Sequence, residues 1–202
     1  MYRINLKTMT ILIVALLLLA IPASAYIQTE ISMKQVLAQT QFIFTAKVES
    51  FDAQKRTAVF SVDEHLKGKV PFQKLHMALA ADKETAREYN KPSYLLKRLS
   101  AKQTVVFFAD AREGAFAPIR RGNMVLFLYA NGTWVQFAGV TEDKGQTDLP
   151  IAFHHFEPYL RRTFKGPTVE MRQVIIDGLS GNKAPPPYDP KEPGGFGPEL
   201  KP

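Results

Sequence analysis

Cysteine is absent from this chain of 202 residues. The absence excludes disulfide bonds, thiolate catalysis and zinc sites built on thiolates. It also excludes a lipid anchor on a cysteine behind an N-terminal leader. The fold therefore depends on the burial of apolar side chains, and a chain of this length is long enough to bury one core.

Catalytic signatures are missing as well. The chain contains no Gly-x-Ser-x-Gly, no His-Glu-x-x-His and no glycine-rich loop that would cradle a phosphate. Its carboxylates are scattered, and no spacing between them indicates a general acid and base pair. We therefore predict a non-catalytic protein without a cofactor, with a secreted hydrolase that uses an unrecognised carboxylate pair as the alternative.

Residues 1–25 have the pattern of a signal peptide. Arg3 and Lys7 give a basic start, an apolar run follows at residues 10–21, and small residues at 23–25 suit a cleavage site. The run is shorter than the roughly 20 residues that a membrane span needs. We predict a secreted or periplasmic (cell-envelope) protein, with an uncleaved leader as the alternative and as the one expected contact with a membrane. The net charge of +7 is too modest to indicate a nucleic-acid partner.

Residues 42–68 predict a long β-hairpin around which the domain is organised. Apolar and polar residues alternate with a period of two on both sides of a polar loop at 52–56. Folding the chain at this loop gives one apolar and one polar face, as strand pairing requires. The predicted pairs are Phe51–Thr57, Val48–Phe60, Lys47–Ser61 with Asp63 on the diagonal, Ala46–Val62 and, as the one mismatch, Phe44–Glu64.

A second hairpin is predicted at residues 124–139. Asn131-Gly132 lies between two alternating runs, which is typical of a two-residue type I′ turn. Leu126, Leu128, Val135 and Phe137 then share the core face, and Phe127, Tyr129 and Trp134 share the other. The predicted pairs are Ala130–Thr133, Tyr129–Trp134, Leu128–Val135, Phe127–Gln136 and Leu126–Phe137.

Shorter patterns complete the predicted fold. Ser32 and Gln35 form a capping box for a short helix, and strands are predicted at 72–80 and 103–109, with helical segments at 81–90 and 93–99. From Ile151 the apolar residues take helical spacing (Phe153, Phe156, Leu160, Phe164), and Thr168–Leu179 predicts a second helix. The last residues, 184–202, hold seven prolines and few side chains that could be buried. The predicted organisation is a signal peptide (1–25), a β-barrel domain (26–150), a helical pair packed on the barrel (151–182) and a disordered Pro/Gly-rich tail (183–202).

The order of these elements suggests a family. The run FTAKVESF…TAVFSVDEHLKGK, with the helix before it, resembles the opening of secreted OB-fold proteins similar to the tissue inhibitors of metalloproteinases and netrin modules. The resemblance covers residues 32–68 and, loosely, the later hairpin. It implies a mainly β fold, a small antiparallel OB-like Greek-key barrel of five strands with flanking helices. It does not carry the inhibitory activity, because that family's inhibitors chelate zinc through an N-terminal cysteine.

Phe127, Tyr129 and Trp134 are the main candidates for a ligand-binding surface. If this aromatic strip is exposed, its rings next to Arg120 and Arg121 would stack on a sugar or a peptide. The alternative is that the C-terminal helices cover the strip.

Weaker candidates lie in the C-terminal region. His154 and Glu157 would share a face of a helix and are the only suggestion of a metal site, for which His65 and His76 would have to converge. Arg161, Arg162, Lys165 and Arg172 form a basic group that would meet an anionic polymer or lipid, or would simply be solvated. Asn131-Gly132-Thr133 matches a glycosylation acceptor, although the turn also explains it.

These observations predict an exported, non-catalytic binding or interaction module. Its partner would be a protein, peptide or carbohydrate. Besides the hydrolase, the second alternative is an envelope structural protein that is tethered through its proline-rich tail.

Overall fold

The computed structural model describes residues 30–52, 54–79, 95, 99–110, 123–140 and 148–194. The predicted signal peptide and the predicted helix at 81–90 lie outside these residues, as does most of the segment at 93–99. The described residues from Ile31 onward belong to one unit. Among the helices in the described ranges, none has the length and apolar character that crossing a membrane requires.

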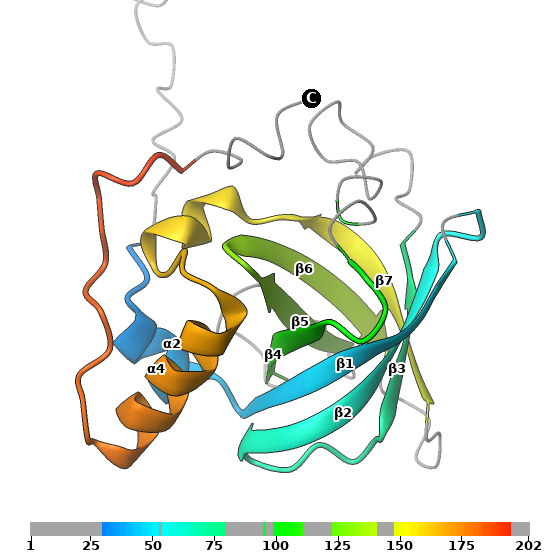
Figure 1. The fold of residues 1–202 in the computed structure, drawn as a ribbon, viewed down its shortest axis with the longest axis horizontal. Helices are drawn as coiled ribbons and strands as arrows, with labels where there is room; N and C mark the ends of the chain where they lie inside the picture. The colour runs from blue at the N-terminus through cyan, green and yellow to red at the C-terminus, as the bar shows by residue number, and fades with distance from the viewer. Residues whose placement is uncertain are drawn as a thin grey trace, which may run out of the picture. The chain divides into compact units, whose positions relative to one another are not determined.

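Seven strands in the described part of the chain close into a barrel (Figure 1). Two runs of consecutive antiparallel strands, β1–β3 and β4–β7, are joined by an antiparallel β1–β4 pair and a parallel β3–β7 pair. The predicted class, a small β barrel with flanking helices, is confirmed, although the family resemblance implied five strands. The strands are β1 (Phe42–Asp52), β2 (Thr57–Lys67), β3 (Lys74–Ala78), β4 (Thr104–Asp110), β5 (Asn123–Ala130), β6 (Thr133–Val140) and β7 (Asp148–Phe156).

The β1–β2 hairpin has the predicted register in its middle and a shifted register at both ends. Val48 lies opposite Phe60, and Lys47 pairs with Asp63 across the strands at 2.8 Å, as predicted. Irregularities at Glu49, near Asp63 and near Leu66 shift the outer pairs by one or two residues. Two predicted pairs are therefore wrong, because Phe51 lies opposite Ala58 and Phe44 lies opposite His65.

The β5–β6 hairpin matches its prediction at every predicted pair. Asn131 and Gly132 both have positive φ angles, +44° and +81°, as a type I′ turn requires. Gly132 also needs its missing side chain, because a Cβ there would lie 2.8 Å from the carbonyl oxygen of Lys165. The turn is therefore both a strand connection and a close contact with the next layer.

The helix predicted from Ile151 is wrong, because residues 148–156 form strand β7. Phe153 lies opposite Phe137 and His155 lies opposite Gln136, so His154 is an extra residue in the ladder. This bulge turns both Phe153 and Phe156 into the barrel core. Two inward residues three apart therefore imitate helical spacing in the sequence.

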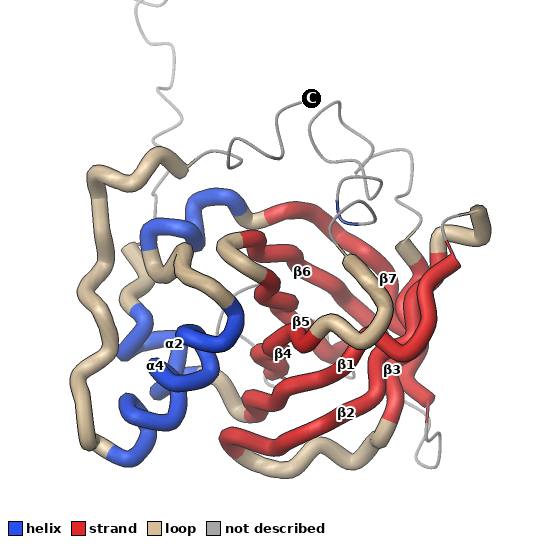
Figure 2. The backbone as a smooth tube through the Cα atoms, in the orientation of Figure 1, coloured by secondary structure: helices blue, strands red, loops and turns tan. Residues whose placement is uncertain are grey.

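Helices cover one side of the barrel (Figure 2). Helix α2 (Met33–Gln39) has the predicted capping box of Ser32 and Gln35. The 3-10 helix η1 (Pro158–Arg162) follows β7, and α4 (Thr168–Ser180) confirms the second predicted helix. The C-cap of α4 is Gly181, which has the left-handed conformation (φ +75°) expected at such a stop.

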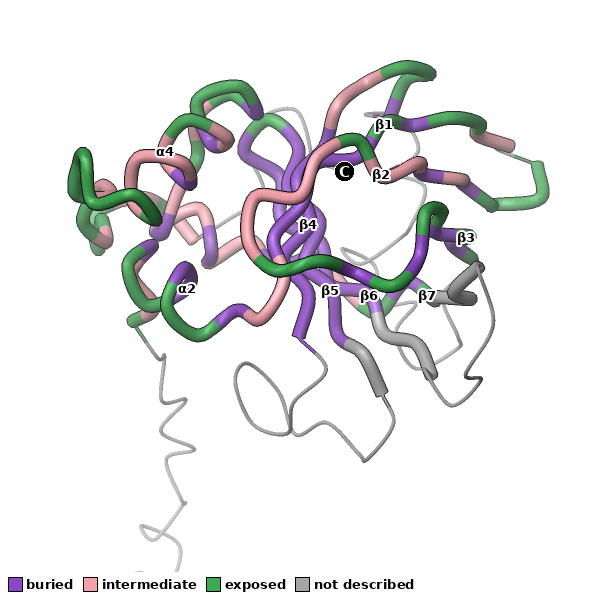
Figure 3. The backbone as a smooth tube through the Cα atoms, turned by 90° about the horizontal axis from the view of Figure 1, so that it is seen from below, coloured by how far each residue is buried: buried purple, intermediate pink, exposed green. Residues whose placement is uncertain are grey.

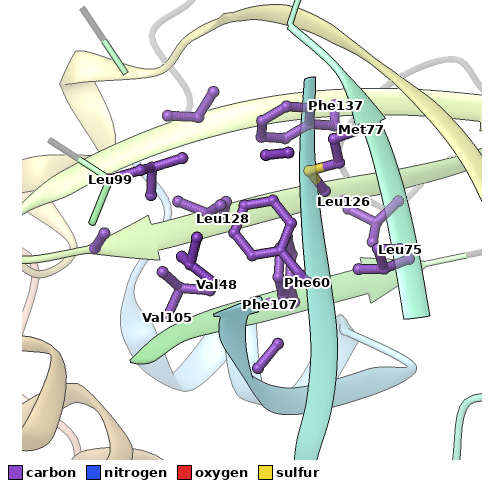
Figure 4. Close-up of a cluster of buried hydrophobic side chains, with 14 of the residues drawn as sticks. Val48, Phe60, Leu75, Met77, Leu99, Val105, Phe107, Leu126, Leu128 and Phe137 are labelled. Atoms are coloured by element: carbon purple, nitrogen blue, oxygen red, sulfur yellow. The ribbon is translucent and has the colours of Figure 1, made fainter. Parts of the chain in front are cut away.

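The central strands are buried on both faces (Figure 3). The inner face fills the barrel with apolar side chains, among them Val48, Phe60, Leu75, Phe107 and Leu128 (Figure 4). The outer face of β4–β6 forms a second cluster with the helices. Its buried members are Met33, Val36, Leu37, Ile43, Val106, Phe108, Val125, Phe127, Tyr129, Trp134, Leu160, Met171 and Ile175.

Phe107 tests the inner core. Its ring is 5.2 Å from Phe44 and 5.3 Å from Phe60, and the side chain is fully buried. We expect Phe107→Ala to lower the free energy of unfolding by about 3–5 kcal/mol in urea titrations, because it leaves a cavity at the centre of the barrel. Val169→Ala, at a residue 74% exposed, should change it by less than about 0.5 kcal/mol. Equal losses from the two variants would contradict this placement of the core.

Candidate interaction surface

The rings of the aromatic strip are buried, and their polar atoms bind the backbone that connects η1 to α4. Tyr129 Oη donates to the carbonyl of Gly166 and accepts from the backbone N–H of Gly132 at 2.9 Å. Trp134 Nε1 donates to the carbonyl of Phe164, also at 2.9 Å. Burial raises the pKa of the Tyr129 phenol, so the hydroxyl remains a hydrogen-bond donor.

The strip therefore serves as a packing surface, in agreement with the covered alternative. Tyr129 is 0%, Trp134 2% and Phe127 6% exposed, in one buried cluster with residues of α2, η1 and α4. A ligand that reached these rings would have to displace that layer. Arg120 and Arg121, the expected neighbours of an exposed strip, lie outside the described residues.

Asn131 caps α4 from the neighbouring hairpin. Its side-chain Oδ1 accepts from the backbone N–H of Thr168 at 3.0 Å, and its backbone N–H donates to Thr168 Oγ1 at 3.0 Å. The residue before the helix, Pro167, makes no side-chain cap. The Asn131 side chain thus takes the role that an N-cap residue usually has. This use, together with the turn, accounts for the motif that resembles a glycosylation acceptor.

The predicted basic group is largely paired within the protein. Arg172 binds Glu64 of β2 through Nε and Nη2, at 2.8 and 2.9 Å. This hydrogen-bonded carboxylate raises the pKa of Arg172. Arg161 and Lys165 bind a second carboxylate, described below. The group is therefore not a free cationic patch.

Residues 184–194, called the strap here, run past α4 and η1 without helix or strand and include a turn at 189–192 (the red segment in Figure 1). The N–H of Asp189 donates to the carbonyl of Arg162 at 2.8 Å, and Arg162 Nε donates to the carbonyl of Glu192 at 2.9 Å. The predicted disorder is thus corrected for this part of the tail, because long-range polar contacts that composition does not reveal hold it. Residues 195–202 lie outside the described residues.

The anchor of the strap is Glu192, which lies in a cationic cradle formed by Arg161, Arg162 and Lys165. Arg161 Nε and Nη2 donate to Glu192 Oε1 at 3.2 and 3.0 Å, and Lys165 Nζ binds Oε2. These cations lower the pKa of Glu192, with the Lys165 hydrogen bond as the largest cause. The sequence pointed to the cations, but nothing local marked Glu192 as their partner.

Hollows lie between the strap and the helices. One of about 480 Å³ is lined by cradle residues, Glu170 and residues 186–189. The next, of about 400 Å³, shares Phe164, Glu170 and Pro186 with the first and has Asp177 and Lys183 at its other side. They make a continuous line along α4, which we call the α4 groove.

A third hollow, of about 520 Å³, lies beyond the groove where α2 and α4 end. Lys34, Lys67 and Lys183 line it. Lys67 Nζ already binds the carbonyls of Leu37 and Ala38, the latter at 3.2 Å. The Lys67 cation is thus used on the negative end of α2.

The histidine pair does not form the predicted arrangement. His154 and Glu157 were expected to share a helical face, but they lie at the bulge and the end of β7, where Glu157 is bonded to His155. His154 Nδ1 contacts His155 Nδ1. No cluster of three or more potential metal ligands occurs among the residues that the structure describes.

Asn131 provides a test of the cap on α4. Asn131→Gly keeps the turn compatible with positive φ but removes the side-chain acceptor, whereas Asn131→Asp keeps an acceptor. We expect Asn131→Gly to be less stable than Asn131→Asp by about 1 kcal/mol in urea unfolding followed by Trp134 fluorescence. Equal stability of the two variants would show that the contact to Thr168 contributes nothing.

Glu192 provides a pH test of the strap. The pKa of Glu192 in the folded protein lies below the ordinary value of 4.5. The strap is therefore fully docked at any pH above 4.5, and it is released as the pH falls through the lowered pKa and the carboxylate is protonated. The Asp189 amide resonance, followed by NMR, should report this release. In Glu192→Gln the acid-dependent step should be absent. A wild-type strap that stays docked until the barrel itself unfolds would contradict the assignment.

Comparison of the chain with protein-family models, with curated proteins and with solved structures gave no match. The resemblance to inhibitor and netrin-like OB folds therefore stays a prediction from the sequence.

Proposed function

We propose that the protein is an exported, non-catalytic interaction module that binds an extended peptide segment of a partner in the α4 groove. The observation that carries the proposal is the hollow of about 400 Å³ between one face of α4 and the strap. Glu170, Gln173, Val174 and Asp177 come from that helix face, since residues three and four apart lie side by side on a helix.

The chemistry of the groove favours an apolar peptide that carries a cation. Phe164, Val174 and Pro186 provide an apolar lining, and two carboxylates, Glu170 and Asp177, outnumber the one cation, Lys183. Within the described residues, no cation is paired with the Glu170 carboxylate. A lysine or arginine side chain of the partner would supply the missing charge, while neighbouring apolar residues would cover the lining.

Two further observations agree with a surface site. Apolar side chains fill the inside of the barrel, which leaves the outer layer as the place for a partner. On α4, Val169 and Leu179 are exposed large apolar residues at 74% and 40%. Leu179 lines the third hollow, beyond the groove, and would extend the apolar area that a partner could cover.

Export to a secreted or cell-envelope setting is the part of the proposal that the signal-peptide pattern of residues 1–25 supports. The two carboxylates of the groove do not favour the hydrolase alternative, since Glu170 and Asp177 lie about two helical turns apart. The other alternative is an envelope structural protein that is tethered through its proline-rich tail. Residues 184–194 do not favour it, because the strap binds the protein's own helices.

Selection of random peptides on the purified protein tests the proposal. We expect selected peptides to carry lysine or arginine among apolar residues. Their affinity should fall about tenfold in Glu170→Gln/Asp177→Asn, which corresponds to ~1.4 kcal/mol for the loss of charge-assisted contacts.

The matched control is Glu49→Gln/Asp63→Asn, which removes two carboxylates from the β1–β2 hairpin. This variant should bind the selected peptides as the wild type does. Failure to select any peptide, or equal binding to the groove variant and the control, would refute the groove as the binding site.

A further inference from the structure

Glu192 is held in the cradle as a bound ligand would be. Arg161 donates two hydrogen bonds to one carboxylate oxygen, at 3.2 and 3.0 Å, and Lys165 binds the other oxygen. Only 11% of the Glu192 side chain is exposed. Guanidinium groups make directional, charge-assisted bonds to carboxylates, and shielding from water strengthens them. The cradle is therefore a preformed binding site for a carboxylate.

The cradle also contacts the main chain of the strap. Arg162 Nε donates to the carbonyl of Glu192 at 2.9 Å, and the carbonyl of Arg162 accepts from the N–H of Asp189 at 2.8 Å. The N–H of Glu192 donates back to the carbonyl of Asp189 at 3.2 Å, which forms a turn. The site thus recognises a carboxylate at a fixed position at the end of a turn.

The strap resembles a peptide ligand that is covalently linked to the domain it binds. None of its residues belongs to either apolar cluster of the described core. Its prolines restrict the free chain to extended conformations, so docking costs little conformational entropy. Gly181, where the strap leaves α4, is exposed and has open space around its missing side chain. The strap can therefore leave the cradle without unfolding the barrel.

We propose that the cradle is a receptor site for acidic, proline-rich peptide segments, and that the strap of a second copy of this chain can occupy it in place of the protein's own. The second copy is the occupant that the structure favours, because it presents the same carboxylate and main-chain groups to an identical cradle. The tether gives the protein's own strap an effective concentration on the order of millimolar. Exchange therefore becomes visible when the protein's own strap is weakened.

This proposal does not rest on the function proposed for the α4 groove. It depends on Arg161, Lys165 and Glu192, whereas the groove proposal depends on Glu170 and Asp177. Each can therefore fail while the other holds.

Complementation between two full-length variants tests the exchange. Glu192→Gln is the receiver, which keeps the cradle but lacks the anchoring carboxylate. Arg161→Gln/Lys165→Gln is the donor, which keeps Glu192 but lacks a cradle for it. We expect each variant alone to sediment as the wild type does, and an equimolar mixture to give an additional species of twice the mass. The matched control is the donor with Glu192→Gln added, which should give no such species.

A peptide probe keeps the test independent of the donor, whose fold also uses Arg161 at the Gly132 carbonyl. A labelled peptide with the sequence of residues 184–194 should bind the receiver at least tenfold more tightly than it binds the wild type, whose cradle is filled. The same peptide with glutamine at the Glu192 position should lose this binding. Peptide binding without the mixed dimer would overturn the second copy as the occupant and assign the cradle to acidic segments of other proteins. Absence of both would overturn the receptor site itself.

Discussion

Burial of the central strands on both faces is the constraint on which the rest of the structure depends. Strands β4, β5 and β6 send apolar side chains into the barrel and, from alternate positions, outward to the second cluster. A closed barrel covers only the first set. The outward set, which includes Phe108 and Trp134, stays out of water only if another layer is added. Helices α2, η1 and α4 supply that layer. In the chain, α2 precedes the barrel strands, and η1 and α4 follow them.

The second constraint is polar. Tyr129 and Trp134 bring a hydroxyl and an indole N–H into the buried layer, where each requires a partner. Both find it on the connection between η1 and α4. Asn131 at the tip of the same hairpin then fixes where α4 begins. The position of one tight turn thus determines the position of a helix more than thirty residues later in the chain, and with it the location of the α4 groove and the cradle.

Local patterns in the sequence were sufficient for most of the barrel. The Asn131-Gly132 turn, the capping box at Ser32 and the alternation around Val48 and Phe60 each depend on neighbours within a few residues, so one sequence carries them. The bulge at His154 could not be predicted from the sequence, because it gives the apolar residues of a strand the spacing of a helix. The candidate site was only half visible for a similar reason: Arg161 and Lys165 stand out in the sequence, but their partner Glu192 lies in a segment whose composition suggests no structure. Pairings between distant charges, such as Glu64 with Arg172, have no local signal at all.

The layer that covers the barrel is recognised through main-chain atoms. The carbonyl groups of Phe164 and Gly166 accept from the aromatic side chains, and the carbonyl of Gly132 accepts from Arg161 in return. A carbonyl group is the same whichever side chain its residue carries. The side chain of residue 165, between these two acceptors, is therefore released from holding the layers together and is available to face outward to Glu192. At position 165, therefore, the binding chemistry can change while the main-chain contacts of residues 164 and 166 that attach the helices to the barrel stay the same.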